Sequence, residues 1–98
     1  MVILILVSME SDAISVTGHA NYAEHGKDIV CAAVSTLTQN LIQSILDLTD
    51  DHIDCEISQG NIDIHYGNLS EESKLLVDSF FVGIAMIANE YPAYVRIV

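Results

Sequence analysis

The sequence predicts an α+β fold, a single domain in which two helices pack on one face of a mainly antiparallel sheet. Two parts of the chain each hold a pair of short apolar runs joined by a turn, which is typical of β-hairpins. Two longer segments carry apolar residues at helical spacing, in one stripe each, which is typical of helices that cover a sheet. The 98 residues suffice for one core. The predicted order is ββαββαβ.

The first hairpin is predicted near the start of the chain. Residues 2–8 form a continuous apolar run, which indicates a strand that is covered on both faces or lies at the centre of the sheet. Residues 9–12 form a turn, and residues 13–19 then alternate with Ile14 and Val16 on one face. These two strands therefore pair with each other.

The second hairpin is predicted after the first helix. Gln59 and Gly60 turn the chain between two alternating segments. Residues 93–98 form a last short strand, which is apolar and lies at a sheet edge that soluble proteins usually cover or charge. The alternating positions of the hairpin are Ile53, Cys55 and Ile57, then Ile62, Ile64 and Tyr66.

The two helices have recognisable ends. Asp28 is predicted to be the N-cap of the first helix, which ends at the acidic residues 49–51. Ser70 caps the second helix and Pro92 ends it. Gly83, inside the second helix, indicates close packing because glycine costs about 1 kcal/mol there relative to alanine. The apolar stripes are Val30, Val34, Leu37, Leu41, Ile45 and Leu48, and then Leu76, Phe80, Ile84, Ile87 and Tyr91.

The charge of the chain limits its partners. Fourteen acidic residues against three basic ones give a formal net charge of −11. Such a chain repels phosphate backbones, so we expect no direct nucleic-acid binding, and it attracts basic partners. The alternative, that the acidity only maintains solubility, stays open at this point.

The N-terminal run and the cysteines indicate a cytoplasmic protein without a metal. The run is too short to span a bilayer, which takes about 20 residues, and it lacks the basic flank and cleavage site of a signal peptide. We therefore expect no membrane association. The two cysteines show no Cys-x-x-Cys spacing. Neither a disulfide framework nor a zinc site is expected, and the pattern calls for no cofactor.

One segment pairs a histidine with a cysteine. His19 ends the second predicted strand, and Cys31 lies in the first turn of the predicted helix. A nucleophilic thiol needs a base within reach and surroundings that favour the thiolate. The unpaired N–H groups of a first helical turn stabilise negative charge there and can serve an oxyanion. Cys31 lies at the edge of the apolar stripe, although a small, inert core cysteine remains an alternative.

His19 is the preferred base among four histidines. A strand holds an imidazole in place better than a mobile loop does, and His25 lies in the predicted loop. His52 and His65 belong to the second hairpin and are predicted to face solvent. The sequence thus favours a dyad of His19 and Cys31.

Neighbouring residues are candidates for supporting roles. Asp28 either caps the helix, which is the preferred interpretation, or orients the imidazole as the third member of a triad. Ser35 hydrogen-bonds the thiol or the substrate, or returns to the Cys31 carbonyl. The loop at residues 20–27 contains Gly26 and is predicted to act as a lid that substrate orders.

The segment Gly18-His19-Ala20 … Gly26-Lys27-Asp28-Ile29-Val30-Cys31-Ala32-Ala33-Val34-Ser35 resembles the signature of the ribosomal-processing cysteine proteases, the Prp family. The resemblance extends over essentially the whole chain and implies the same layout of helices and strands. It implies a cysteine endopeptidase with the His19–Cys31 dyad. The other candidate site residues are Gly18, Asp28 and Ser35 in support, and Ala20, Asn21, Tyr22 and Gly26 in a substrate loop.

The resemblance also implies a substrate and an oligomeric state. Members of the family remove the short N-terminal extension of large-subunit ribosomal protein twenty-seven and form homodimers. A basic ribosomal protein with such an extension is therefore the expected substrate. The alternative function is a non-catalytic acidic domain that docks a basic ribosomal or assembly partner.

Overall fold

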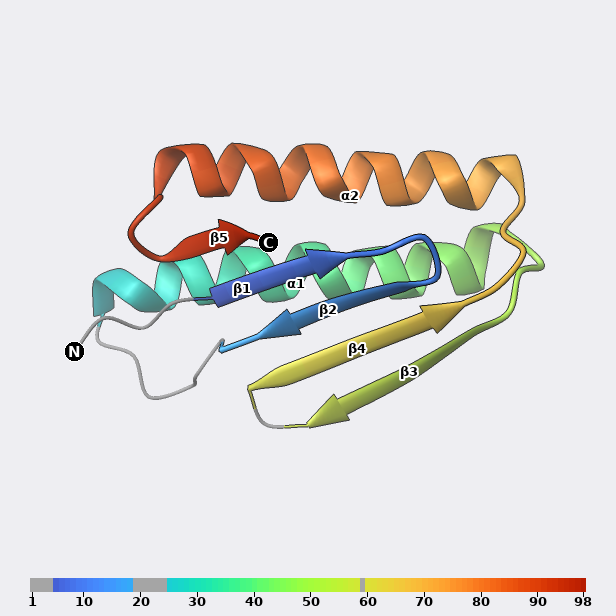
Figure 1. Ribbon diagram of the computed structural model, residues 1–98, viewed down its shortest axis with the longest axis horizontal. Helices are drawn as coiled ribbons and strands as arrows, with labels where there is room; N and C mark the ends of the chain where they lie inside the picture. The colour runs from blue at the N-terminus through green and yellow to red at the C-terminus, as the bar shows by residue number, and fades with distance from the viewer. Residues whose placement is uncertain (1–4, 19–24, 59) are drawn as a thin grey trace.

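The predicted order ββαββαβ is confirmed in the computed structural model (Figure 1). The structure describes residues 5–18, 25–58 and 60–98, with residues 25–28 described by their backbone alone. The elements are β1 (Ile5–Met9), β2 (Ala13–Thr17), α1 (His25–Leu48), β3 (Ile53–Ser58), β4 (Asn61–Tyr66), α2 (Glu71–Glu90) and β5 (Val95–Ile97).

The five strands form one mixed sheet in the order β3-β4-β2-β1-β5. The pairing of β1 with β5 is parallel and the other three pairings are antiparallel, so the prediction of a mainly antiparallel sheet is confirmed. Strand β1 lies inside the sheet, as its apolar run indicates. Residues 2–4 of that run lie outside the described residues.

The core lies on one face of the sheet. Val7 pairs with Val16, which pairs with Ile62, and Ile14 pairs with Ile64, so that the buried side chains of β1, β2 and β4 share that face. Both helices supply the rest of the core. Of the two alternatives for the first strand, the structure supports the position inside the sheet.

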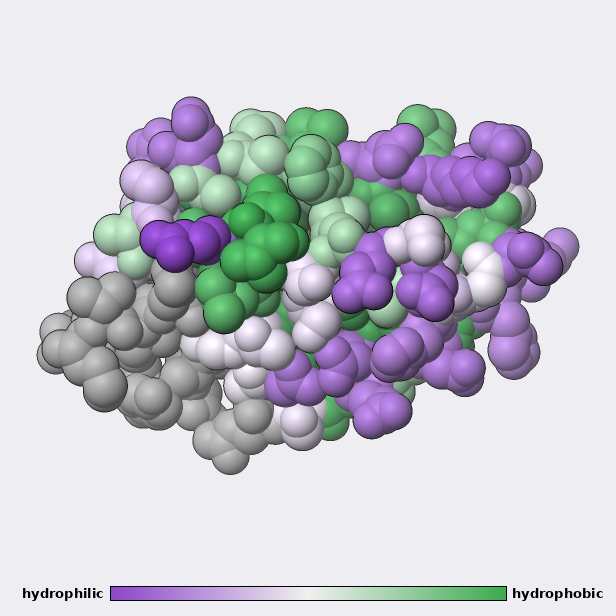
Figure 2. Space-filling view, viewed as in Figure 1, coloured by the Kyte–Doolittle hydropathy of each residue, from purple (hydrophilic) through white to green (hydrophobic). Residues whose placement is uncertain are grey.

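The open face of the sheet is polar over β2, β3 and β4. Ser15 pairs with Asp63, which pairs with Glu56, and hydrophilic side chains gather over this part of the molecule (Figure 2). Hydrogen bonds from Ser15 and Asn61 hold the pKa of Asp63 below its usual value, and the Asn61 amide lies 2.7 Å from the carboxylate. Part of the acidity of the chain thus keeps an uncovered sheet face in water.

The apolar stripe of α1 is confirmed over most of its length. Val30, Val34, Leu41 and Ile45 are buried, whereas Leu48 is 71% exposed because it is the last residue of the helix. Thr38 is fully buried, and its hydroxyl donates to the Val34 carbonyl at 2.7 Å. The segment Ile29–Leu48 is also long and apolar enough to cross a bilayer, a property that the core helix of a globular fold shares.

The second helix packs closely against the first, as Gly83 predicts. A Cβ atom added at Gly83 would lie 2.9 Å from Cδ1 of Leu37, which is too close for an ordinary contact. Phe80 and Ile84 of its stripe are buried, and Tyr91 forms the C-cap just before Pro92. Glycine therefore sets the approach of the two helices.

Hydrogen bonds of Asp51 connect the segment that follows α1 to the start of α2. The Asp51 carboxylate accepts from the backbone N–H of Ser70 at 3.0 Å and from its hydroxyl at 2.6 Å, and also from the Ser73 hydroxyl. Ser70 is the predicted N-cap and accepts from the Ser73 N–H. Hydrogen bonds from Ser70 and then Ser73 hold the pKa of Asp51 below its usual value.

Asp51→Asn should lower the thermal unfolding midpoint by a few degrees at pH 7. The lowered pKa means that the Asp51 carboxylate stabilises the fold above the ordinary pKa near 4, and that this stability is lost as the pH falls through the lowered value. Thermal unfolding followed by circular dichroism between pH 2 and 7 measures both effects. Asp50→Asn is the control, because Asp50 is an exposed neighbour. Equal losses of stability in the two variants would contradict the stabilising role of the Asp51 hydrogen bonds.

Candidate active site

Cys31 lies on α1 at the edge of the core. Its side chain is partly exposed and packs against the buried cluster, as the helical spacing predicts. A thiol in this position is held by neighbouring side chains and yet can be reached from solvent. The placement thus suits a nucleophile better than full burial would.

The first helix begins earlier than predicted. It starts at His25, so Asp28 lies inside the helix and the prediction that Asp28 is its N-cap is wrong. Gly26 is likewise helical, and the predicted loop at residues 20–27 is wrong for its last three residues. The entropic cost of glycine applies to the middle of a helix, and Gly26 is only the second residue of α1. A long, packed helix therefore extends through it.

The earlier start changes the electrostatics expected around Cys31. Within the described helix, the N–H groups without helical acceptors belong to residues 25–27, about 6 to 9 Å along the axis from Cys31. Because the dipole effect falls off within the first turn, it acts on Cys31 less than predicted. The expectation that these groups serve an oxyanion at Cys31 is not supported by this geometry.

The end of β2 lies at the same end of the molecule as the start of α1 (Figure 1). Gly18 has a φ of 86°, a conformation that favours glycine, and its N–H donates to the Gly60 carbonyl at 2.8 Å. Gly18 is the last residue of this segment that the structure describes, and it is therefore held beside the β3–β4 turn. His19 itself, with Ala20, Asn21 and Tyr22, lies outside the described residues, and its role stays a prediction.

The topology excludes two histidines as partners of Cys31. His52 and His65 are exposed, as predicted. His52 follows the end of α1, and His65 pairs with Asp54 nearby. The helix rises about 26 Å from Cys31 to Leu48. Of the histidines that the structure describes, His25 alone belongs to the Cys31 end.

Ser35 lies on α1 near Cys31, whereas Cys55 lies on another element, β3. Ser35 is half-buried one turn after Cys31, so its side chain lies on the same part of the helix surface, and its role stays a prediction. Cys55 is half-buried and packs against the core from β3, as predicted. Burial, and then the charge of Asp54, raise the pKa of the Cys55 thiol. Cys55 therefore lacks the properties of a nucleophile.

An apolar groove, called the outer groove below, lies between α1 and α2. Its volume is about 620 Å³, and none of the described residues that line it is charged. At 100° per residue, Thr36 in the groove points about 140° away from Cys31 around the helix. The groove is thus a surface separate from the thiol. Its lining residues are Ile29, Ala32, Ala33, Thr36, Leu37, Gly83, Met86 and Ile87.

Comparison with known proteins extends over nearly the whole chain. The sequence model of the family described as cysteine protease Prp matches residues 2–96. A Staphylococcus aureus relative named ribosomal processing cysteine protease Prp is 28% identical over 83 residues, which cover 82% of this chain and 78% of the relative. A Bacillus subtilis relative of the same name is 25% identical over 88 residues, with 83% and 79% covered.

Solved structures share the fold. A Streptococcus mutans protein has a TM-score of 0.82 and 30% identity, covering 96% of this chain and 90% of that one. The S. aureus processing protease Prp in complex with a substrate peptide has a TM-score of 0.85 at 22% identity, covering 97% and 96%. At that identity the second likeness supports the fold alone.

Proposed function

Because the chain belongs to the cysteine protease Prp family, we propose that Cys31 is its nucleophile and His19 its general base. The chain is a cysteine protease, a hydrolase that acts on peptide bonds. The observation that carries the assignment is the reachable position of Cys31, at the end of the molecule where β2 stops just before His19. The two histidines of the second hairpin belong to the other end.

The proposed reaction follows from these two residues. His19 takes the thiol proton while the Cys31 sulfur attacks the peptide carbonyl, and His19 then gives the proton to the leaving amine. A thioester between the Cys31 sulfur and the acyl group remains. Water, deprotonated by His19, hydrolyses the thioester and restores the thiol. Each step balances without a cofactor.

We propose that the substrate is a basic ribosomal protein with an N-terminal extension. The relatives are named ribosomal processing proteases, and a structural neighbour holds a substrate peptide. The net charge of −11 supports a basic substrate, because opposite charge raises the encounter rate. The same charge opposes direct nucleic-acid binding. The cytoplasm, where ribosomes assemble, is the proposed location.

Incubation with the extended ribosomal protein tests this function, with mass spectrometry of the products. Loss of the extension in one cut is expected, and a substrate that remains intact contradicts the proposal. A limiting dose of iodoacetamide at neutral pH tests the nucleophile separately. It should alkylate Cys31 before Cys55, because burial raises the pKa of the Cys55 thiol. Equal labelling of both would argue for a non-catalytic docking domain.

We further propose that two copies associate through the outer groove. Strongly acidic copies repel each other, and the lining of this surface is uncharged over its described residues. Val82 and Met86 beside it are 59% and 68% exposed. The sheet edge at β5 is three residues long and carries the exposed charge of Arg96, which makes it a poorer surface for pairing. The groove therefore supports a homodimer better than the edge does.

Sedimentation at micromolar concentration should show a species near twice 10.7 kDa. Met86→Glu should convert it to monomer, because it places a charge in each half of an apolar contact. Val98→Glu is the matched control at the β5 edge, where Val98 is 63% exposed. Dissociation by the Val98 variant alone would move the interface to the edge strand. A monomer throughout would contradict the dimer itself.

A further inference from the structure

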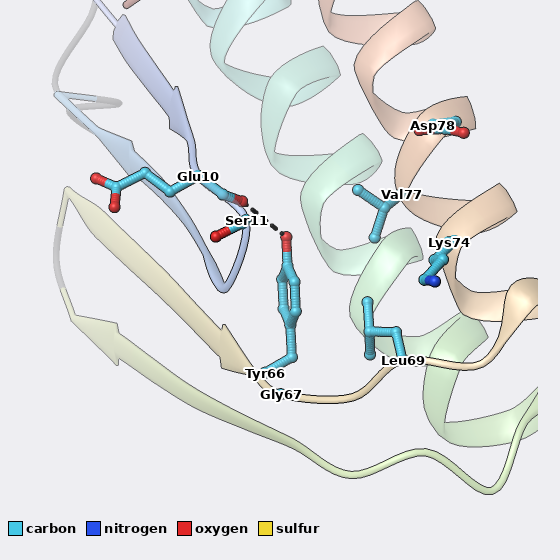
Figure 3. A pocket seen from close by; sticks show the side chains of 8 residues that line it. All are labelled: Glu10, Ser11, Tyr66, Gly67, Leu69, Lys74, Val77 and Asp78. Atoms are coloured by element: carbon cyan, nitrogen blue, oxygen red, sulfur yellow. Dashed lines mark hydrogen bonds between the residues drawn. The ribbon is translucent and has the colours of Figure 1, made fainter.

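A small cleft opens between the β1–β2 turn and the first turns of α2, at the end of the molecule where α1 ends (Figures 1 and 3). Its volume is about 240 Å³. Pockets for cofactors and drug-sized ligands start at about 300 Å³, so this cleft suits a single amino-acid side chain. It is lined by Glu10 and Ser11 in the turn, Tyr66, Gly67 and Leu69 after β4, and Lys74, Val77 and Asp78 on α2.

The floor of the cleft is apolar and held in place. Leu69, Val77 and the ring of Tyr66 are half-buried and surround the space. The Tyr66 hydroxyl donates to the Glu10 carbonyl at 3.4 Å, which links two segments 56 residues apart. The Glu10 side chain itself turns away from the cleft in Figure 3. An aliphatic stem can therefore lie along a preformed surface.

The surroundings of the cleft are negative on balance. Burial, and then the charge of Asp12, raise the pKa of the Tyr66 hydroxyl. Asp78 stands at the rim. Lys74 is the one cation in the lining; its ammonium group is 3.5 Å from Glu71, and its side chain is 59% exposed. The carboxylates of Glu10 and Asp78 outnumber this one ammonium group in the lining, and Glu71 lies beside it, which favours a positively charged occupant.

We propose that this cleft receives an arginine side chain of a basic polypeptide. The stem lies on Leu69 and Val77, the guanidinium lies beside the Tyr66 ring, and the Asp78 carboxylate accepts its N–H groups. Arginine fits better than lysine because its planar head stacks on an aromatic ring. This proposal rests on the proposed function in one respect: the basic polypeptide is taken to be the ribosomal substrate. The cleft would hold that substrate at a point remote from Cys31.

Binding is measured with the full chain carrying Cys31→Ala, so that no cleavage interferes. The probes are N-acetyl-arginine amide and N-acetyl-citrulline amide, which have similar shapes but differ in charge. Amide signals of Gly67, Leu69 and Val77 in ¹H–¹⁵N spectra should shift with the arginine probe and much less with the citrulline probe.

Two single substitutions should move the affinity in opposite directions. Asp78→Asn should weaken arginine binding about two- to fivefold, and Lys74→Gln should strengthen it by a similar factor, as expected for exposed charge pairs. Glu90→Gln, which removes an exposed carboxylate at the other end of α2, should leave binding unchanged. Equal shifts with both probes, or weaker binding by the Lys74 variant, would overturn the proposal. Because the assay needs no catalysis, its outcome is independent of whether the protein cleaves the extended ribosomal protein.

Discussion

Cys31→Ala should abolish cleavage of the extended ribosomal protein and leave the fold intact. Removal of the nucleophile in a protease lowers kcat by more than about 10⁴-fold, because the covalent route is lost altogether. The side chain is partly exposed at the core edge, so its loss opens little cavity. Product mass spectrometry gives the activity, and thermal unfolding monitored by circular dichroism gives the stability.

Cys55→Ser is the matched control for the Cys31 variant. Cys55 packs against the core from β3 and has no part in the proposed chemistry. This variant should lose stability while the folded fraction cleaves as fast as the parent. Cleavage that survives Cys31→Ala and disappears with Cys55→Ser would show that the wrong thiol has been assigned.

His19→Ala should lower kcat about 10²- to 10⁴-fold, the usual contribution of a general base. His25→Ala should keep most of the activity, since His25 is the first residue of α1 and precedes Cys31 by nearly two turns. Initial rates at saturating substrate separate the two variants. Added imidazole should restore part of the rate to the His19 variant, because free imidazole is a base of the same kind as the side chain that was removed.

The opposite ranking of the two histidine variants would transfer the role of base to His25 while leaving Cys31 as the nucleophile. His25 begins the helix that carries Cys31, and His19 follows the described end of β2, so this comparison decides between them. No such test is needed for His52 and His65, which the length of α1 places at the other end.

Local patterns predicted most of the fold. Alternation over two residues and stripes at helical spacing depend on neighbours in the chain, which explains why both hairpins and the order of elements are confirmed. Ser70 is confirmed as an N-cap because its hydroxyl bonds three residues away. The start of α1 was mispredicted, since the preference of Asp28 for a cap competes with packing along a long helix.

The remaining surface features depend on contacts between distant segments. The Tyr66 hydroxyl donates a hydrogen bond to Glu10, 56 positions away in the sequence, and the Leu37 side chain of α1 packs beside Gly83 of α2. No periodicity in the sequence encodes the cleft or the outer groove that these contacts shape. The position of the Cys31 thiol at the edge of the core, by contrast, could be predicted from its place beside an apolar stripe.

The parallel pairing of β1 with β5 has a consequence for synthesis on the ribosome. Ile5 pairs with Val95, so one edge of β1 has no partner until 90 more residues of the chain have been synthesised. At about 5 to 20 residues per second, this wait lasts about 5 to 18 seconds. During that time β1 exposes a row of backbone groups that can pair with another nascent chain. The chain thus completes its own sheet only after translation has delivered the last strand.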